Sequence, residues 1–62
     1  MFEQNLYDEI ADIHQRKLQA SKDLGELLRR VSQTDLHEPI ARLHANAQRN
    51  VLLAQRLVEI VS

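Results

Sequence analysis

The sequence predicts an all-α protein, an antiparallel hairpin of two helices, on three observations. In both halves of the 62-residue chain, apolar residues recur at alternating spacings of three and four. This pattern suits the 3.6-residue period of a helix and not the two-residue period of a strand. One glycine and one proline are present, too few for the turns of a β-sheet protein. A single cluster of turn-forming residues divides the chain near its middle, so we treat residues 1–62 as one hairpin domain.

The first helix is expected over about residues 3–31. Its apolar residues form one stripe at heptad spacing, interrupted only by Lys17. Gly25 lies inside this helix with no stop signal around it. At a cost of roughly 1 kcal/mol relative to alanine, we expect this glycine to let another backbone approach closely. The stripe consists of Leu6, Ile10, Ile13, Ala20, Leu24, Leu27 and Val31.

A turn over about residues 32–35 and a second helix over about residues 36–61 are expected next. Asp35 and Glu38 have the spacing of a capping box, and Pro39 is tolerated because it lies near the helix start. The second stripe is interrupted only by Asn50. It consists of Leu36, Ile40, Leu43, Ala47, Ala54, Leu57 and Val61.

The short connection makes the two helices antiparallel neighbours. If the two stripes face each other, the numbers of facing residues add to about 67, so that Leu24 meets Leu43. The same register places Lys17 opposite Asn50. We therefore expect these two residues to form a polar layer that fixes the register of the hairpin.

The second helix has more apolar surface than one neighbour can cover. From residue 51 to residue 61 it is apolar nearly all the way round, and such a helix is buried on more than one side. We expect two hairpins to complete a four-helix bundle as a homodimer; the alternative is a different helical protein as partner. The expected protein interface consists of Val51, Leu52, Leu53, Leu57, Val58 and Ile60.

The polar residues form no recognisable catalytic or metal site. His37 and His44 are seven residues apart, whereas ligands on one helix need a spacing of three or four. The acidic residues Asp8, Glu9 and Asp12 indicate a solvated helix face, which lacks the burial that a general acid or base needs. We expect no enzyme activity, no metal, no cofactor and no small-molecule substrate.

A row of basic residues is the one pattern that fits an anionic partner. Arg42, Arg49 and Arg56 recur every seven residues on the second helix, about 10 Å apart along one face. The row has three interpretations: a solvated bundle surface, contacts to an acidic protein, or contacts to RNA phosphates. Aromatic residues, which RNA-binding proteins often use, are nearly absent.

The composition favours a cytoplasmic protein outside the membrane. The chain contains no cysteine, begins without a basic segment followed by an apolar run, and has a net charge of −1. Its longest apolar run covers residues 51–54, far short of the roughly 20 residues that span a bilayer. The near-neutral charge provides no general attraction for nucleic acid.

In length and hairpin architecture the chain resembles small plasmid copy-number proteins that clamp RNA loops. It also resembles small co-chaperones of bacterial secretion systems and small helical inhibitors of regulatory proteins. Architecture alone does not transfer function. The sequence predicts a non-enzymatic protein–protein interaction module (an adaptor, co-chaperone or regulator) that acts as a helical-hairpin oligomer. The alternative is an RNA-binding bundle that uses the arginine row.

Overall fold

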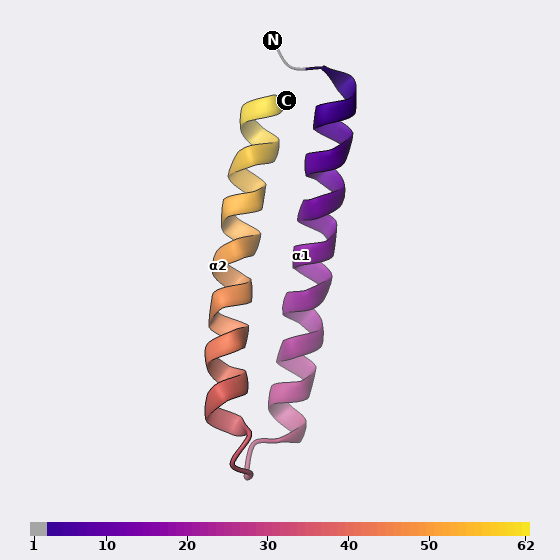
Figure 1. Ribbon diagram of the computed structural model, residues 1–62. Coiled ribbons are helices and arrows are strands. Elements are labelled where there is room, and N and C mark those ends of the chain that lie inside the picture. The colour runs from indigo at the N-terminus through magenta and orange to yellow at the C-terminus, as the bar shows by residue number, and fades with distance from the viewer. Residues whose placement is uncertain (1–2) are drawn as a thin grey trace.

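A computed structural model describes residues 3–62 and shows two α-helices joined by a short turn (Figure 1). Helix α1 spans Gln4–Arg30 and helix α2 spans His37–Val61. The helices run antiparallel, so the first turn of α1 and the last turn of α2 lie at the same end (Figure 1). Each helix boundary agrees with the expected one to within one residue. The prediction of an all-α protein with two helices packed against each other is confirmed.

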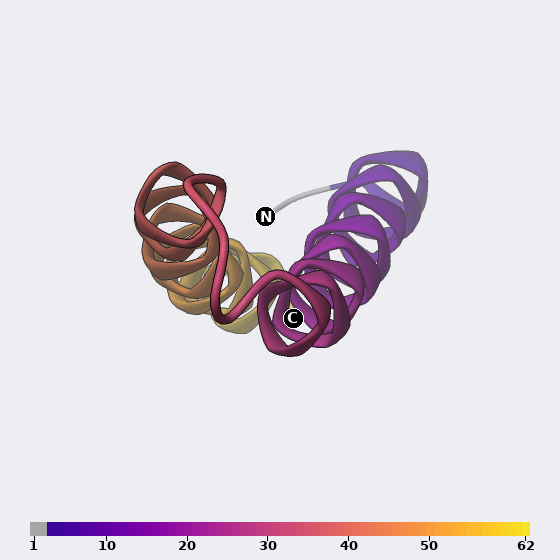
Figure 2. The same ribbon diagram turned by 90° about the horizontal axis from the view of Figure 1, so that it is seen from below.

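The hairpin is a thin rod that encloses little core. It measures 49 × 13 × 11 Å, and its radius of gyration is 14.4 Å, against about 11 Å for a compact chain of this length. Among residues 3–62, Ala54 is the one buried residue, at 5% exposed. Seen along its length (Figure 2), the described chain has no third element over either broad side of the helix pair.

Thr34 organises the turn between the helices. Its hydroxyl donates a hydrogen bond to the carbonyl oxygen of Val31 (2.9 Å) and accepts one from the backbone N–H of Leu36 (3.2 Å). The expected capping box at Asp35 is wrong: Leu36 precedes the first residue of α2, and no side chain caps that helix end. Pro39 is the third residue of α2, where no intrahelical partner exists for a backbone N–H.

On α1 the contact between the helices is rotated away from the expected stripe, although Leu6, Ile10, Leu24, Leu27 and Val31 of that stripe are still half-buried. In the middle of α1, Leu18 and Ser21 are half-buried, whereas Ile13, Lys17 and Ala20 are exposed. We name the contacting residues the inter-helix seam. On α1 the seam consists of Tyr7, Ala11, His14, Leu18, Ser21, Gly25 and Leu28, and on α2 of Ile40, His44, Ala47, Val51, Ala54, Val58 and Val61.

Small residues explain why this stripe is chosen. Each seam residue of α1 directly follows either a residue of the expected stripe or Lys17, which interrupts that stripe. The two stripes therefore lie about 100° apart on the helix. Ala11 and Ser21 on α1, with Ala47 and Ala54 on α2, allow the helix backbones to approach closely. The larger leucines and isoleucines then flank the contact. Leu43 and Leu57 are accordingly 54% and 48% exposed, although the sequence pattern places them between the helices.

Gly25 makes room for a side chain and not for a backbone. A Cβ atom at Gly25 would lie 3.3 Å from Nε2 of His44, so the imidazole occupies the space that a larger residue would fill. The expectation that another backbone approaches Gly25 is wrong.

Facing residues also follow a slightly different register: Gly25 lies beside His44, and Tyr7 lies near Val61. Their numbers add to 69 and 68, against the expected 67.

Candidate interaction surface

One broad side of the hairpin carries nearly all of its exposed large apolar side chains. On both helices, the residue that directly precedes each seam residue is rotated from it by about 100°. An approximate two-fold axis perpendicular to the helix pair relates two antiparallel helices, so these preceding residues fall on the same side. We name this side the open face. It consists of Leu6, Ile10, Ile13, Lys17, Ala20, Leu24, Leu27 and Val31, the last beyond the end of α1, together with Leu36, Pro39, Leu43, Asn46, Asn50, Leu53, Leu57 and Ile60.

Large apolar groups of the open face are accessible to solvent. Ile13 is 46% exposed, Leu53 is 55% exposed and Ile60 is 64% exposed. Among residues 3–62, Leu52 is the one exposed large hydrophobic residue that lies elsewhere. An exposed apolar surface of this kind on a small protein marks a contact surface.

The opposite broad side is polar. It is formed by the residues that directly follow the seam, and its only apolar members are Ala41, Ala45 and Leu52. The other members are Asp8, Asp12, Gln15, Gln19, Lys22, Glu26, Arg29, Gln48, Gln55, Glu59 and Ser62. The hairpin as a whole is therefore amphipathic, because both helices turn their leucines and isoleucines to the same side.

Three polar residues interrupt the open face near its mid-length. Lys17, Asn46 and Asn50 are all exposed, so Lys17 and Asn50 do not form the expected layer between α1 and α2. Beside Lys17, a hollow of about 390 Å³ is lined by Ile13, Arg16, Lys17 and Ala20. The small side chain of Ala20 leaves this space on the open face.

The six residues predicted as a protein interface divide between three places. Leu53, Leu57 and Ile60 lie on the open face, whereas Val51 and Val58 are half-buried in the seam. Leu52 is 64% exposed on the other side of α2. The open face also includes Leu43 of α2 and Leu36 just before that helix, two residues that were not among the six predicted. The signal for Leu43 is its position directly before the seam residue His44, and Leu36 lies seven residues before Leu43 on the same face.

The predicted arginine row lies exposed along α2. Nη2 of Arg42 is 2.8 Å from a carboxylate oxygen of Glu38, one helical turn away. Within residues 3–62, no carboxylate lies within ion-pair distance of Arg49 or Arg56. These two guanidinium groups flank a shallow hollow that also includes Leu52, Leu53, Gln55 and Glu59.

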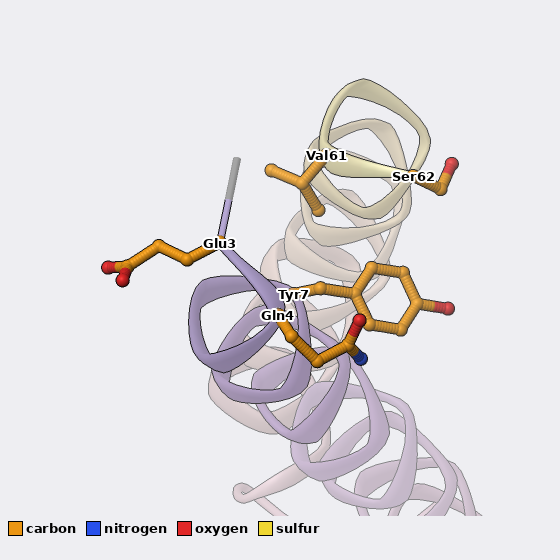
Figure 3. Close-up of a pocket in the computed structure, with 5 residues that line it drawn as sticks. All are labelled: Glu3, Gln4, Tyr7, Val61 and Ser62. Carbon is orange, nitrogen blue, oxygen red and sulfur yellow. The ribbon is translucent and has the colours of Figure 1, made fainter. Parts of the chain in front are cut away.

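The open end of the hairpin forms a further hollow (Figure 3), lined by Glu3, Gln4, Tyr7, Val61 and Ser62. The Tyr7 ring lies beside the last turn of α2 with its hydroxyl pointing outwards, and the Glu3 carboxylate points away from the other side chains (Figure 3). This arrangement brings no acid, base and nucleophile together.

His14 and His44 are half-buried in the seam, whereas His37 is exposed at the start of α2. In the described part of the chain, no three acidic or histidine side chains gather as a metal site.

Comparison with known proteins adds no family. No family model matches the chain, and no characterised protein or solved structure shows significant similarity to it. Neither described helix is both long enough and apolar enough to cross a membrane. The open face is therefore the feature of the molecule on which a functional argument rests.

Proposed function

We propose that this chain is a non-enzymatic protein–protein interaction module that acts as a helical-hairpin oligomer in the cytoplasm, as an adaptor, co-chaperone or regulator. The observation that carries the proposal is the open face, on which exposed leucines and an isoleucine of α2 lie beside exposed Ile13 and half-buried leucines of α1. Burial of such a surface is the main source of association free energy. Since Ala54 is the one buried residue among residues 3–62, the hairpin gains little stability from its own core.

The exposed area of the chain supports the same proposal. Its solvent-accessible area is 5113 Å², whereas a compact monomer of this mass exposes about 4100 Å². The excess of about 1000 Å² is similar to the roughly 800 Å² that each partner buries in a standard protein interface. The chain thus exposes enough surface beyond that of a compact monomer for a stable contact.

The proposal is tested by placing charges on the open face. We expect the double variant Leu53→Asp, Leu57→Asp to lower the mass of the particle in solution and to lose helicity, because buried carboxylates without partners oppose association. Light scattering gives the mass, and circular dichroism over a dilution series gives the helicity. For the unaltered chain, we expect an oligomer whose helicity falls on dilution.

Gln48→Asp, Gln55→Asp is the matched control, since it adds the same charges to the polar side of α2. This control should keep the mass and helicity of the unaltered chain. The proposal fails if the unaltered chain is a monomer with concentration-independent helicity. It also fails if the open-face variant keeps its mass.

An RNA-binding bundle is the second candidate, and the exposure of Arg42, Arg49 and Arg56 in one row favours it. Binding to structured RNA would weaken steeply as salt rises, because each neutralised phosphate releases counterions. Replacing the three arginines with glutamine would then weaken binding at low salt. A flat titration of the unaltered chain against structured RNA at low salt removes this candidate.

A further inference from the structure

We propose that the open face is covered by the open face of a second copy of this chain, related by a two-fold axis parallel to the helices. Helix α1 of each copy then lies against α2 of the other, and both turns lie at the same end of a four-helix bundle. This inference rests on the proposed function and deepens it by naming the partner and its orientation. The positions of the polar residues and the charges along the edges of the open face both favour this orientation over the one in which the turns lie at opposite ends.

The positions of the polar residues along the rod favour the orientation with both turns at one end. In the observed register, facing residues of α1 and α2 have numbers that add to 68 or 69. Asn50 is therefore level with residues 18–19 of α1, and Asn46 is level with residues 22–23. With both turns at one end, Lys17 and Ala20 of one copy interleave with Asn50 and Asn46 of the other. Outside this middle zone, Leu6, Ile10, Leu27 and Val31 of one copy then meet apolar residues of the other, whereas Leu53 also comes close to the level of Lys17, and Leu24 to that of Asn46.

The pairing of Lys17 with Asn50 is chemically matched. An ammonium group only donates hydrogen bonds, and the side-chain oxygen of an asparagine accepts them. With the turns at opposite ends, α1 lies against α1 of the other copy, and the middle zone brings Lys17 beside Lys17. Two like charges would then meet within an apolar contact that excludes water, where their repulsion is strong. The opposite-end orientation would also place Asn46 among leucines of the other α2.

The charges along the two edges of the open face favour the same orientation. On the outer edge of α1, Glu9, Arg16, Asp23 and Arg30 recur every seven residues, and on that of α2 the arginine row follows Asp35. With both turns at one end, four acid–base pairs across the contact come within about one helical turn of being level. They are Glu9 with Arg56, Asp23 with Arg49, Asp23 with Arg42, and Arg30 with Asp35 of the other copy.

In the opposite-end orientation, the α2 edges of the two copies face each other and repel. There α2 lies against α2, so the three arginines of one copy interleave with the three arginines of the other. The α1 edge cannot relieve this repulsion, since it then faces only α1. With both turns at one end, the charges that remain alike are Arg16 and Arg30 beside the arginine row, and Arg16 already pairs with Asp12 at 2.8 Å.

The orientation is measured with spin labels, which the absence of cysteine makes simple. A nitroxide on Gln33→Cys marks the turn, and pulsed electron spin resonance gives the distance between the two labels. Light scattering on the same sample gives the mass. We expect twice the 7.2 kDa of one chain and a label separation of about two helix spacings, roughly 20 Å. The opposite orientation would separate the labels by approximately the 49 Å length of the rod.

Gln15→Cys is the control, because this residue lies on the polar side near mid-length and gives similar distances in both orientations. It shows that labelling leaves the dimer intact. A dimer whose Gln33→Cys labels are separated by the rod length overturns this inference and leaves the proposed function standing. A monomer overturns both. A mass other than that of two chains overturns the inference that one second copy covers the open face.

Discussion

At the scale of the residue, the contact between α1 and α2 depends on small side chains. Gly25, Ser21 and Ala54 lie in the seam, and the one buried residue of the described chain is Ala54. Only His14 and His44 bring rings of medium size into the middle of this contact. The seam thus tolerates little added volume, and substitutions there should be sensitive to size more than to polarity.

Gly25 gives a size-dependent prediction. Gly25→Ala should raise the melting temperature, because alanine favours a helix by roughly 1 kcal/mol over glycine. The new Cβ would lie 3.3 Å from the end of the His44 ring, which can shift by a few tenths of an ångström. Gly25→Leu should lower the melting temperature, since a whole side chain must displace that ring. Thermal circular dichroism at fixed protein concentration measures both.

His44→Ala is the control for this pair. Combined with Gly25→Leu, it should recover part of the stability that Gly25→Leu loses, because it empties the space that the leucine enters. If Gly25→Ala and Gly25→Leu lower the melting temperature equally, the imidazole cannot move.

Thr34 gives a prediction about the turn. Thr34→Val should lower stability by about 1 kcal/mol, because it removes the hydroxyl that bonds Val31 and Leu36. Asp35→Asn is the control and should change stability less, since Asp35 caps no helix and an exposed ion pair with Arg30 of another copy contributes little. Urea unfolding followed by circular dichroism measures the difference. A larger loss for Asp35→Asn than for Thr34→Val would contradict this account of the turn.

At the scale of the element, each helix carries two apolar stripes that are one residue apart. On α1 the stripe richer in leucine and isoleucine lies on the open face, and the stripe with alanine, serine and glycine faces α2. On α2 the second stripe includes Leu53, Leu57 and Ile60, which accounts for the apolar composition of its last turns. A helix with two such stripes has two neighbours in a bundle.

Ala54 tests which stripe faces the other helix. Ala54→Leu should destabilise the hairpin by about 1–3 kcal/mol, because a larger side chain in the seam forces the helices apart. Ala45→Leu makes the same chemical change on the exposed polar side of α2 and should have little effect. Thermal circular dichroism of both variants gives the comparison. Equal effects of the two substitutions would show that Ala54 does not lie between the helices.

At the scale of the whole molecule, the hairpin behaves as one amphipathic body. Its open face is apolar at both ends and polar at mid-length, and this order along the rod is what specifies how two copies could align. In coiled-coil proteins, a polar residue within an apolar contact sets orientation at a cost in stability. Lys17 and Asn50 are the candidates for that role.

Removing these polar groups should separate stability from orientation. Lys17→Leu with Asn50→Leu should move dissociation of the dimer to lower protein concentration, because more apolar area is buried. The separation of labels at Gln33→Cys should then split into a short and a long population, since the polar match no longer selects one orientation. Light scattering and spin-label distances measure the two effects. A single short distance would show that the edge charges alone set the orientation.

The sequence determined the two helices and their ends. Alternating spacings of three and four, one turn cluster and a proline near a helix start are local features, and helix formation depends mainly on such local features. They were sufficient to place each boundary within one residue. The apolar surplus after residue 50, including Leu53, Leu57 and Ile60, was also evident from the sequence.

Only the tertiary structure decided which stripe of α1 faces α2, whereas Ile40, Ala47, Ala54 and Val61 of the stripe expected on α2 do lie in the seam. Two stripes about 100° apart have the same period, so periodicity cannot choose between them. The choice depends on how closely two backbones can approach, which the small residues of the seam and the space beside Gly25 for His44 determine. That rotation moved Lys17 and Asn50 from between the helices to the open face, because turning a helix about its axis moves every side chain with it.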